Sequence, residues 1–430
     1  MFRASVGGGA ATPTPYRHPL LLAMSTLIAP ALSARRARRG GWSSLTLALV
    51  ALLMSWDDGP TILDRFTSAH ALAGPRRGRT YQGFAKAVGR GGATLVRTLR
   101  RHLAGLIRRA HPDLWMIGGW CLFAVDGSKF DVPRTLAHEM VLGVRGRDGR
   151  SLPQLMAIIL VHLGSGLLWD WRLSRTDTGE RRGMLAMLAS LPRNALVVAD
   201  AGFAGYECLW AVVASGRHVL VRLAGNVTLV TGLARRADMV ALWPKHHQPR
   251  GGPLWLRVIR VKDGTGGDVV LGTSVLERDR LSDEQVALFY RLRWGVEVCY
   301  RSLKQTLRRR KLLSASPARA VLELHWVMLG MMTLGLLTHA RLNRRLDRRR
   351  WSVAAAARAV RHAARSRRDG VARHHLRTLR SAVCGDNRRR SKAAWNWAHK
   401  KNPEPPGPPD TRRATRREVM RWRALARQTR

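Results

Sequence analysis

The chain has 430 residues, of which 75 are Lys or Arg and 28 are Asp or Glu, so its formal net charge is +47. This length predicts two or three domains, and an apolar content of 46% is enough for a folded core, which excludes a chain that is disordered throughout. A charge of +47 disfavours an enzyme of small metabolites, because self-repulsion destabilises a compact protein unless a polyanion offsets it, and it therefore indicates nucleic acid as the partner.

Residues 1–41 contain one apolar stretch, residues 19–34, which is similar to a secretory signal but is followed at once by four arginines. The apolar run 45–54 is too short to span a membrane and predicts a buried helix. No CxxC or Cys/His spacing is present, so neither a disulfide framework nor a zinc site is expected. We therefore expect a cytoplasmic, nucleoid-associated protein without a membrane partner.

Residues 42–115 are predicted to be helical. In residues 94–110 apolar side chains recur at spacings of three and four, with arginines on the other side. Those arginines fit a solvated face and a DNA-facing helix equally well. In a chain this basic we assign residues 42–115 to a DNA-end-binding region.

From Leu122 onward short apolar runs alternate with helical stretches, which predicts a mixed α/β domain. Three strands, a helix, a strand, a helix and a strand are expected between residues 122 and 223. A β-rich insertion follows, and a helix begins near Ser282. The predicted segments are 116–225 for the first part of this core, 226–268 for the insertion, 269–340 for the second part, and 341–430 for a basic, partly disordered helical tail.

The helix after Ser282 carries one carboxylate, Glu297, inside a row of cations. At 100° per residue it shares a face with five other residues, namely Tyr290, Arg293, Arg301, Lys304 and Arg308. The opposite side, which includes Leu288, is apolar and is expected to pack on the core. Taken alone, Glu297 could simply be an ion-pair partner of Arg293 or Arg301.

Asp126 and Asp200 alter this interpretation, because each directly follows an apolar strand and stands next to or near a glycine. A lone aspartate in such a place is usually a turn or cap residue. Two of them together with a helical glutamate supply the hard oxygen ligands that a two-metal phosphoryl-transfer site needs. Asp131 and Asp170 are weaker competitors, and His246 and His247 have no acid or Cys at ligand spacing.

These residues resemble the DDE transposases of bacterial insertion sequences, in the branch with a YREK signature. The spacing Tyr-x2-Arg-x3-Glu-x6-Lys is matched at Tyr290, Arg293, Glu297 and Lys304, and the resemblance covers about residues 115–340. It implies a ribonuclease-H-like core, with Asp126, Asp200 and Glu297 as the catalytic and metal-binding residues. The metal would be two Mg²⁺ ions, with Mn²⁺ as a substitute. Tyr290, Arg293 and Lys304, joined by Arg301 from the same cationic row, would hold DNA.

The resemblance further implies hydrolysis of DNA at terminal inverted repeats and transfer of the freed strand to target DNA, by a homodimer in the synaptic complex. Two departures stand out. Ala201 occupies the position that is often Arg after the second aspartate, and Val269 occupies the strand position matched to an aromatic that holds a flipped base. Trp243 and Trp255 could take over that role or pack in the core. The alternatives are a non-catalytic DNA-binding protein, such as a degenerate transposase copy, and a nuclease of the same fold.

Overall fold

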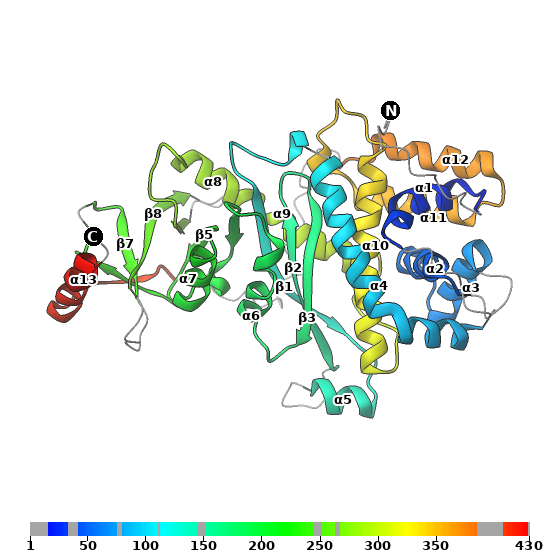
Figure 1. Cartoon of the computed structure of the whole chain (residues 1–430), viewed down its shortest axis with the longest axis horizontal. Coiled ribbons are helices and arrows are strands. Elements are labelled where there is room, and N and C mark those ends of the chain that lie inside the picture. Colours follow the sequence, from blue (N-terminus) through cyan, green and yellow to red (C-terminus); the bar gives the residue numbers. More distant parts are fainter. Residues whose placement is uncertain are drawn as a thin grey trace, which may run out of the picture. The chain divides into compact units, whose positions relative to one another are not determined.

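The computed structural model describes residues 16–32, 42–74, 80–110, 112–144, 152–234, 236–243, 252–262, 267–384 and 407–428 (Figure 1). The chain forms two compact units. The helical unit consists of Met1–Leu103, His325–Asn343 and Val353–Ala382, and the sheet unit of Ala104–Leu324, Arg344–Ser352 and Val383–Arg430. The predicted segment 341–430 thus contributes to both units. His246, His247 and much of 1–41 lie outside the described residues.

The sheet unit contains a ten-stranded sheet, and one half of it has the strand order β3-β2-β1-β4-β5. The strands are β1 (Leu122–Asp131), β2 (Gln154–His162), β3 (Leu167–Arg175), β4 (Leu196–Ala199) and β5 (His218–Leu223). β2 is antiparallel to both β1 and β3, whereas β1, β4 and β5 are parallel to one another. This arrangement is the ribonuclease-H-like fold, and it confirms the predicted fold class.

The predicted insertion extends the same sheet beyond β5. β9 (Asp268–Thr273) pairs antiparallel with β5, and the order then continues through β8 (Leu254–Lys262), β7 (Met239–Leu242), β6 (Thr228–Thr231) and β10 (Asp410–Arg413). Val269 is buried in β9. Trp243 and Trp255 pack in an apolar cluster with Val230 and Trp422, so core packing accounts for both tryptophans.

Helices cover both faces of the sheet (Figure 1). α6 (Glu180–Leu185) contacts β1, β2 and β3, and α7 (Tyr206–Ala214) contacts β5 and α6. On the other face lie α8 (Asp283–Leu292) and α9 (Trp294–Arg301). α8 begins at the predicted cap, because Ser282 and Gln285 form a reciprocal capping box. A short helix, α5 (Leu136–Leu142), follows β1.

The prediction of one continuous helix after Ser282 was wrong. α8 ends at Leu292, α9 begins at Trp294, and residues Ser302–Thr306 form a π-helical turn. These interruptions change the angular position of each later side chain, so the six polar residues do not share one regular face. Leu288, expected in the core, is 40% exposed. Arg308 lies beyond the helix with a φ of 54°.

The helical unit is built from α1 (Pro19–Ile28), α2 (Ser44–Trp56), α3 (Ile62–Ala73), α11 (Val353–Arg365), α12 (Asp369–Arg377) and parts of α4 (Tyr81–Ala110) and α10 (Pro317–His339). The described part of the stretch similar to a signal sequence, residues 19–32, contains α1, whose Leu20, Leu21 and Met24 are buried. Among the described helices, α10 alone is long and apolar enough to cross a membrane. However, 78% of its most apolar window is buried inside the structure, which is how a core helix packs.

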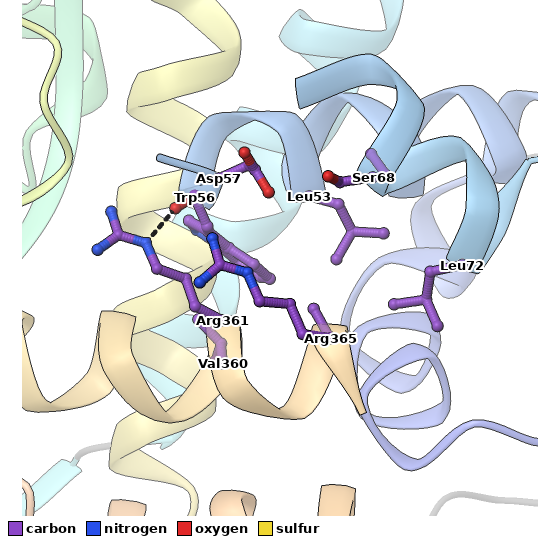
Figure 2. A pocket seen from close by; sticks show the side chains of 10 residues that line it. Leu53, Trp56, Asp57, Ser68, Leu72, Val360, Arg361 and Arg365 are labelled. Carbon is purple, nitrogen blue, oxygen red and sulfur yellow. Dashed lines mark hydrogen bonds between the residues drawn. The ribbon is translucent and has the colours of Figure 1, made fainter. Parts of the chain in front are cut away.

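A small pocket in the helical unit lies where the end of α2 meets α3 and α11 (Figure 2). Its volume is about 30 Å³, which holds a water molecule and no larger ligand. Arg361 reaches across it and donates from Nε to the Trp56 carbonyl at 2.5 Å, while Arg365 pairs with Asp58. These arginines close the end of α2, because a helix leaves its last carbonyl groups without helical partners.

The chain end is anchored on the sheet by Glu418, which is 3% exposed on α13 (Arg416–Gln428). Its carboxylate pairs with Arg412 on β10 and accepts from the Thr415 backbone N–H. These hydrogen bonds, led by Arg412, lower the pKa of Glu418 to about 2. A depressed carboxyl pKa contributes stability that is present above the ordinary value near 4.5 and is lost as the pH falls toward 2.

We expect Glu418→Gln to loosen the docking of β10 and α13 by about 2 kcal/mol, because the amide loses the charge that Arg412 and the Thr415 cap require. Hydrogen exchange at pH 7 should show faster exchange in residues 410–428, with little change in β1 or β2. Glu277→Gln serves as the control, since Glu277 is exposed. Unchanged exchange in the Glu418 variant would contradict this role.

Candidate active site

The sheet register brings Asp126 and Asp200 level with each other. β1 pairs with β4 through Leu122 with Leu196 and Ala124 with Val198. Two residues further along the chain lie Asp126, within β1, and Asp200, directly after the end of β4. Parallel neighbours are about 4.8 Å apart, and residues separated by two share one face of the sheet. Asp126 is in the interior of β1, which continues to Asp131, and not at the strand end that the sequence predicted.

Asp200 directly follows β4 and caps a short turn at Ala201–Phe203. Its Oδ1 accepts from the Gly202 N–H at 2.9 Å. Phe203, the last residue of this turn, fixes it to the protein core, because its side chain is fully buried. Arg181 on α6 donates to the Gly202 and Ala204 carbonyls, both at 2.9 Å, so a guanidinium lies over this turn although Ala201 itself is not basic.

The carboxyl of Asp126 has a strongly raised pKa of about 7. Burial is the main cause, and the neighbouring charges of Asp200 and Glu180 raise the pKa further. A hydrogen bond from the Gly127 N–H at 2.8 Å and the charge of Arg293 act in the opposite direction without compensating. The carboxylates therefore repel one another, which is the electrostatic condition that a divalent cation would relieve.

Glu180 is a site residue that the sequence analysis missed. It starts α6, and its pKa is raised by burial and by Asp200. Its approach to β1 depends on Gly127, since a Cβ atom at residue 127 would lie 2.4 Å from Glu180 Oε1. No spacing signalled its position, because an acidic residue in the first turn of a helix is common for capping reasons alone. The Asp-Gly pair at 126–127 was the one usable clue.

Glu297 is held by an ion pair with Arg293. The Arg293 Nη2 to Glu297 Oε1 distance is 2.8 Å, and the two side chains are 13% and 29% exposed. Arg293 also interacts electrostatically with Asp126 and Asp200. Arg293 therefore connects the third predicted acid to the other two, and the ion pair that the sequence left open as an alternative is present.

The remaining predicted DNA contacts lie at different places. The Arg293 guanidinium is 5.5 Å from the centre of the Tyr290 ring, and burial raises the pKa of Tyr290. Lys304 donates to Ser128 Oγ at 2.7 Å, close to Asp126, and burial lowers its pKa. Arg301 is exposed. Arg293 thus places a positive charge close to the carboxylates of Asp126 and Asp200. Arg222 adds a second positive charge near Tyr290.

Tyr300, a second residue that the sequence analysis missed, braces the strand that carries Asp126. Its hydroxyl lies 3.0 Å from the Asp126 carbonyl and 2.6 Å from the Ala157 carbonyl. The ring packs near Phe130 at a centroid distance of 6.3 Å. A buried hydroxyl with two acceptors fixes the backbone of β1 at the position where the side chain of Asp126 must be held.

The donors fit a hard cation in chemistry but are not assembled as a three-acid cluster. Within the described ranges no three His, Cys, Asp or Glu side chains group as a metal site. Asp126 and Asp200 supply the carboxylate oxygens that Mg²⁺ prefers as ligands, whereas Glu297 is engaged by Arg293. The competitors are used elsewhere: Asp170 is buried with Arg172, and Asp131 accepts from Gln154.

No curated protein sequence matches this chain. A cryo-EM structure of a piggyBac transposase synaptic complex with hairpin DNA aligns with it at a TM-score of 0.42 and 9% identity, covering 86% of each chain. The family described as Transposase DDE domain matches residues 118–333, just over half of the chain and the part that holds Asp126, Asp200 and Glu297. The chain therefore belongs to the DDE-domain transposase family.

Proposed function

We propose that this protein is an active DNA transposase of a bacterial insertion sequence, in the branch with the YREK signature. It hydrolyses a phosphodiester at each terminal inverted repeat and joins the freed 3′-hydroxyl to target DNA. Membership of the family and a net charge of +47 support DNA as the substrate. Two ends must be held together, so the working form is a homodimer on DNA, and the place of action is the nucleoid.

Asp126 and Asp200 would hold the divalent cations, with Glu297 as the third ligand. When bound, two Mg²⁺ ions, or Mn²⁺ in their place, supply Lewis acidity to the attacking and leaving oxygens. The observation that supports this assignment is the register of β1 and β4, which leads to Asp126 and Asp200 two residues beyond the last paired residues, Ala124 and Val198. The raised pKa of Asp126 adds to it, because a protonated carboxyl near pH 7 would lose its proton in favour of a cation.

Arg293 links DNA binding to the release of Glu297 in this proposal. Its guanidinium is occupied by Glu297 in the free protein. A DNA phosphate, like a carboxylate, offers two anionic oxygen acceptors to a guanidinium, so it competes for these donors. Once the phosphate takes Arg293, Glu297 is free to turn toward Asp126 and Asp200. Tyr290 and Lys304 then hold neighbouring parts of the DNA backbone.

A product assay separates the three functions. The wild-type protein is incubated with a duplex that carries the inverted repeat flanking its gene, and with a circular target, in Mg²⁺ or in EDTA. A transposase gives Mg²⁺-dependent cleavage followed by joined products. Cleavage without joining would replace the proposal by a nuclease, and binding without cleavage in either Mg²⁺ or Mn²⁺ would replace it by a non-catalytic DNA-binding protein.

A further inference from the structure

The helical unit carries an exposed basic surface on and around α12, which we call the α12 ridge. It consists of the exposed residues Arg367, Arg368, Arg373, His374, Arg377 and Arg380. Residues 353–384 contain eight arginines and a single acidic residue, Asp369. The ridge is separate from the carboxylate site, which is built from residues of the sheet unit.

The side of α12 opposite the ridge packs against other helices, so the ridge residues face away from them. Ala372 and Leu376 are buried, and α12 contacts α11 and α1. At 100° per residue, Arg373, Arg377 and His374 are displaced from Ala372 by about 100°, 140° and 200°. These three side chains therefore project from the side of α12 that no described helix covers, consistent with their exposure.

The charge of the ridge is not neutralised within the protein. On α11, Arg361 bonds the Trp56 carbonyl (Figure 2), and both Arg361 and Arg365 pair with Asp58, so those charges are used internally. In contrast, none of the five arginines of the ridge forms an ion pair with any residue that the structure describes. A group of exposed arginines that have no ion-pair partner among the described residues is suited to an external polyanion.

We propose that α12 enters the major groove of double-stranded DNA, with Arg373 and Arg377 reading base edges and Arg367, Arg368 and Arg380 contacting phosphates. α11 and α12 are joined by three residues, Ser366 to Arg368, the connection length of DNA-binding helix pairs. Nine helical residues span about 14 Å, which suits a groove about 12 Å wide. Gly370 has open space around its α-carbon, so the backbone can approach the DNA closely.

This inference takes DNA as partner from the proposed function but does not depend on cleavage. The test is therefore made in EDTA with the full chain. Wild-type protein first selects its preferred sequences from a pool of random 30-base-pair duplexes. Affinities for a selected and a scrambled duplex are then measured by fluorescence anisotropy. We expect Arg373→Gln/Arg377→Gln to lose at least about 10-fold in affinity for the selected duplex and much less for the scrambled one.

The matched control is Arg193→Gln/Arg260→Gln, which removes the same charge from two exposed positions of the sheet unit. It should retain the preference for the selected duplex. Methylation of guanine N7 in the major groove provides a second measurement that uses only wild-type protein, and it should block binding to the selected duplex. This second measurement decides the question if the ridge variant does not fold.

Three results would overturn the proposal: a wild-type protein without sequence preference, a ridge variant with the wild-type preference, or binding that is indifferent to N7 methylation. An equal loss on both duplexes, with a smaller salt dependence, would also overturn it, because phosphate contacts alone would then explain the ridge. An Asp200→Asn protein should keep the preference even if it cannot cleave. Failure of this inference is thereby distinguished from failure of the proposed function.

Discussion

Replacing Asp200 by Asn should reduce Mg²⁺-dependent cleavage of a transposon-end duplex by about 1,000-fold or more, equivalent to about 4 kcal/mol. The amide keeps the oxygen that accepts from the Gly202 N–H, so the turn after β4 should remain folded. What is lost is a negative charge next to Asp126, and with it the affinity for a hard cation. DNA binding should stay within about 2-fold, because a single neutralised acid removes no phosphate contact.

Asp268→Asn is the matched control, since it removes one carboxylate from an exposed position on β9. It should cleave at the wild-type rate. Asp126→Asn and Glu297→Gln should both show large losses, which would distinguish a three-acid site from the aspartate pair alone. A wild-type cleavage rate for the Asp200 variant would show that the carboxylate pair is not the catalytic centre.

Asp126→Asn should stabilise the metal-free protein at pH 8, by about 2 to 3 kcal/mol more than at pH 5. The folded-state pKa of Asp126 is about 7, whereas an unfolded chain has a value near 3.8. The unfolded chain therefore releases this proton first as the pH rises. Stability falls between about pH 4 and pH 7, and the full penalty remains above pH 7. An asparagine has no proton to lose and escapes this penalty.

Urea unfolding of the wild-type and variant proteins in EDTA, at several pH values, measures the difference. In the Glu180→Gln variant the fall in stability with rising pH should end at a lower pH than in the wild type, because the substitution removes one of the charges that raise the pKa of Asp126. Asp268→Asn again provides the control and should follow the wild-type curve. If the advantage of Asp126→Asn were the same at pH 5 and pH 8, repulsion at this site would be excluded as its cause.

The order of strands around the site could be predicted because local patterns determine it. β2 and β3 form a hairpin around Gly164 to Gly166, and β4 is a short apolar strand that leads directly to Asp200, as expected. The helical content of residues 42–110 follows equally from apolar spacing. The register of β1 and β4 leads to Asp126 and Asp200 at corresponding positions, although only Asp200 stands at a strand end as the sequence predicted.

The irregular features could not be predicted in the same way. The break at Arg293 and the π-helical turn at Ser302–Thr306 interrupt a sequence that has ordinary helical spacing, so an ideal helix placed Leu288 and Arg308 wrongly. Glu180 reaches the site through a tertiary contact with Gly127, which has no signature along the chain. The pairing of β10 with β6 joins segments about 180 residues apart, which local patterns do not encode.

The positive charge of residues 341–430, +22 in total, does not all lie on a separate basic tail, because parts of this segment belong to both compact units. Some of it lies on the α12 ridge, some on α11 is paired with Asp58, and Arg412 is paired with Glu418. Deleting the whole segment would therefore remove packed elements such as α11 and α12 together with the charge. Substitutions of exposed arginines are the cleaner way to separate DNA affinity from folding.

The most direct test of the central claim, that Asp126 and Asp200 hold the catalytic cation, is metal rescue of Asp200→Cys. A thiolate is a softer ligand than a carboxylate and binds Mn²⁺ better than Mg²⁺. Cleavage of the transposon-end duplex by this variant should be abolished in Mg²⁺ and measurably restored in Mn²⁺, while Asp268→Cys behaves as wild type in both. Cleavage at the wild-type rate in Mg²⁺, or no recovery in Mn²⁺, would contradict the claim.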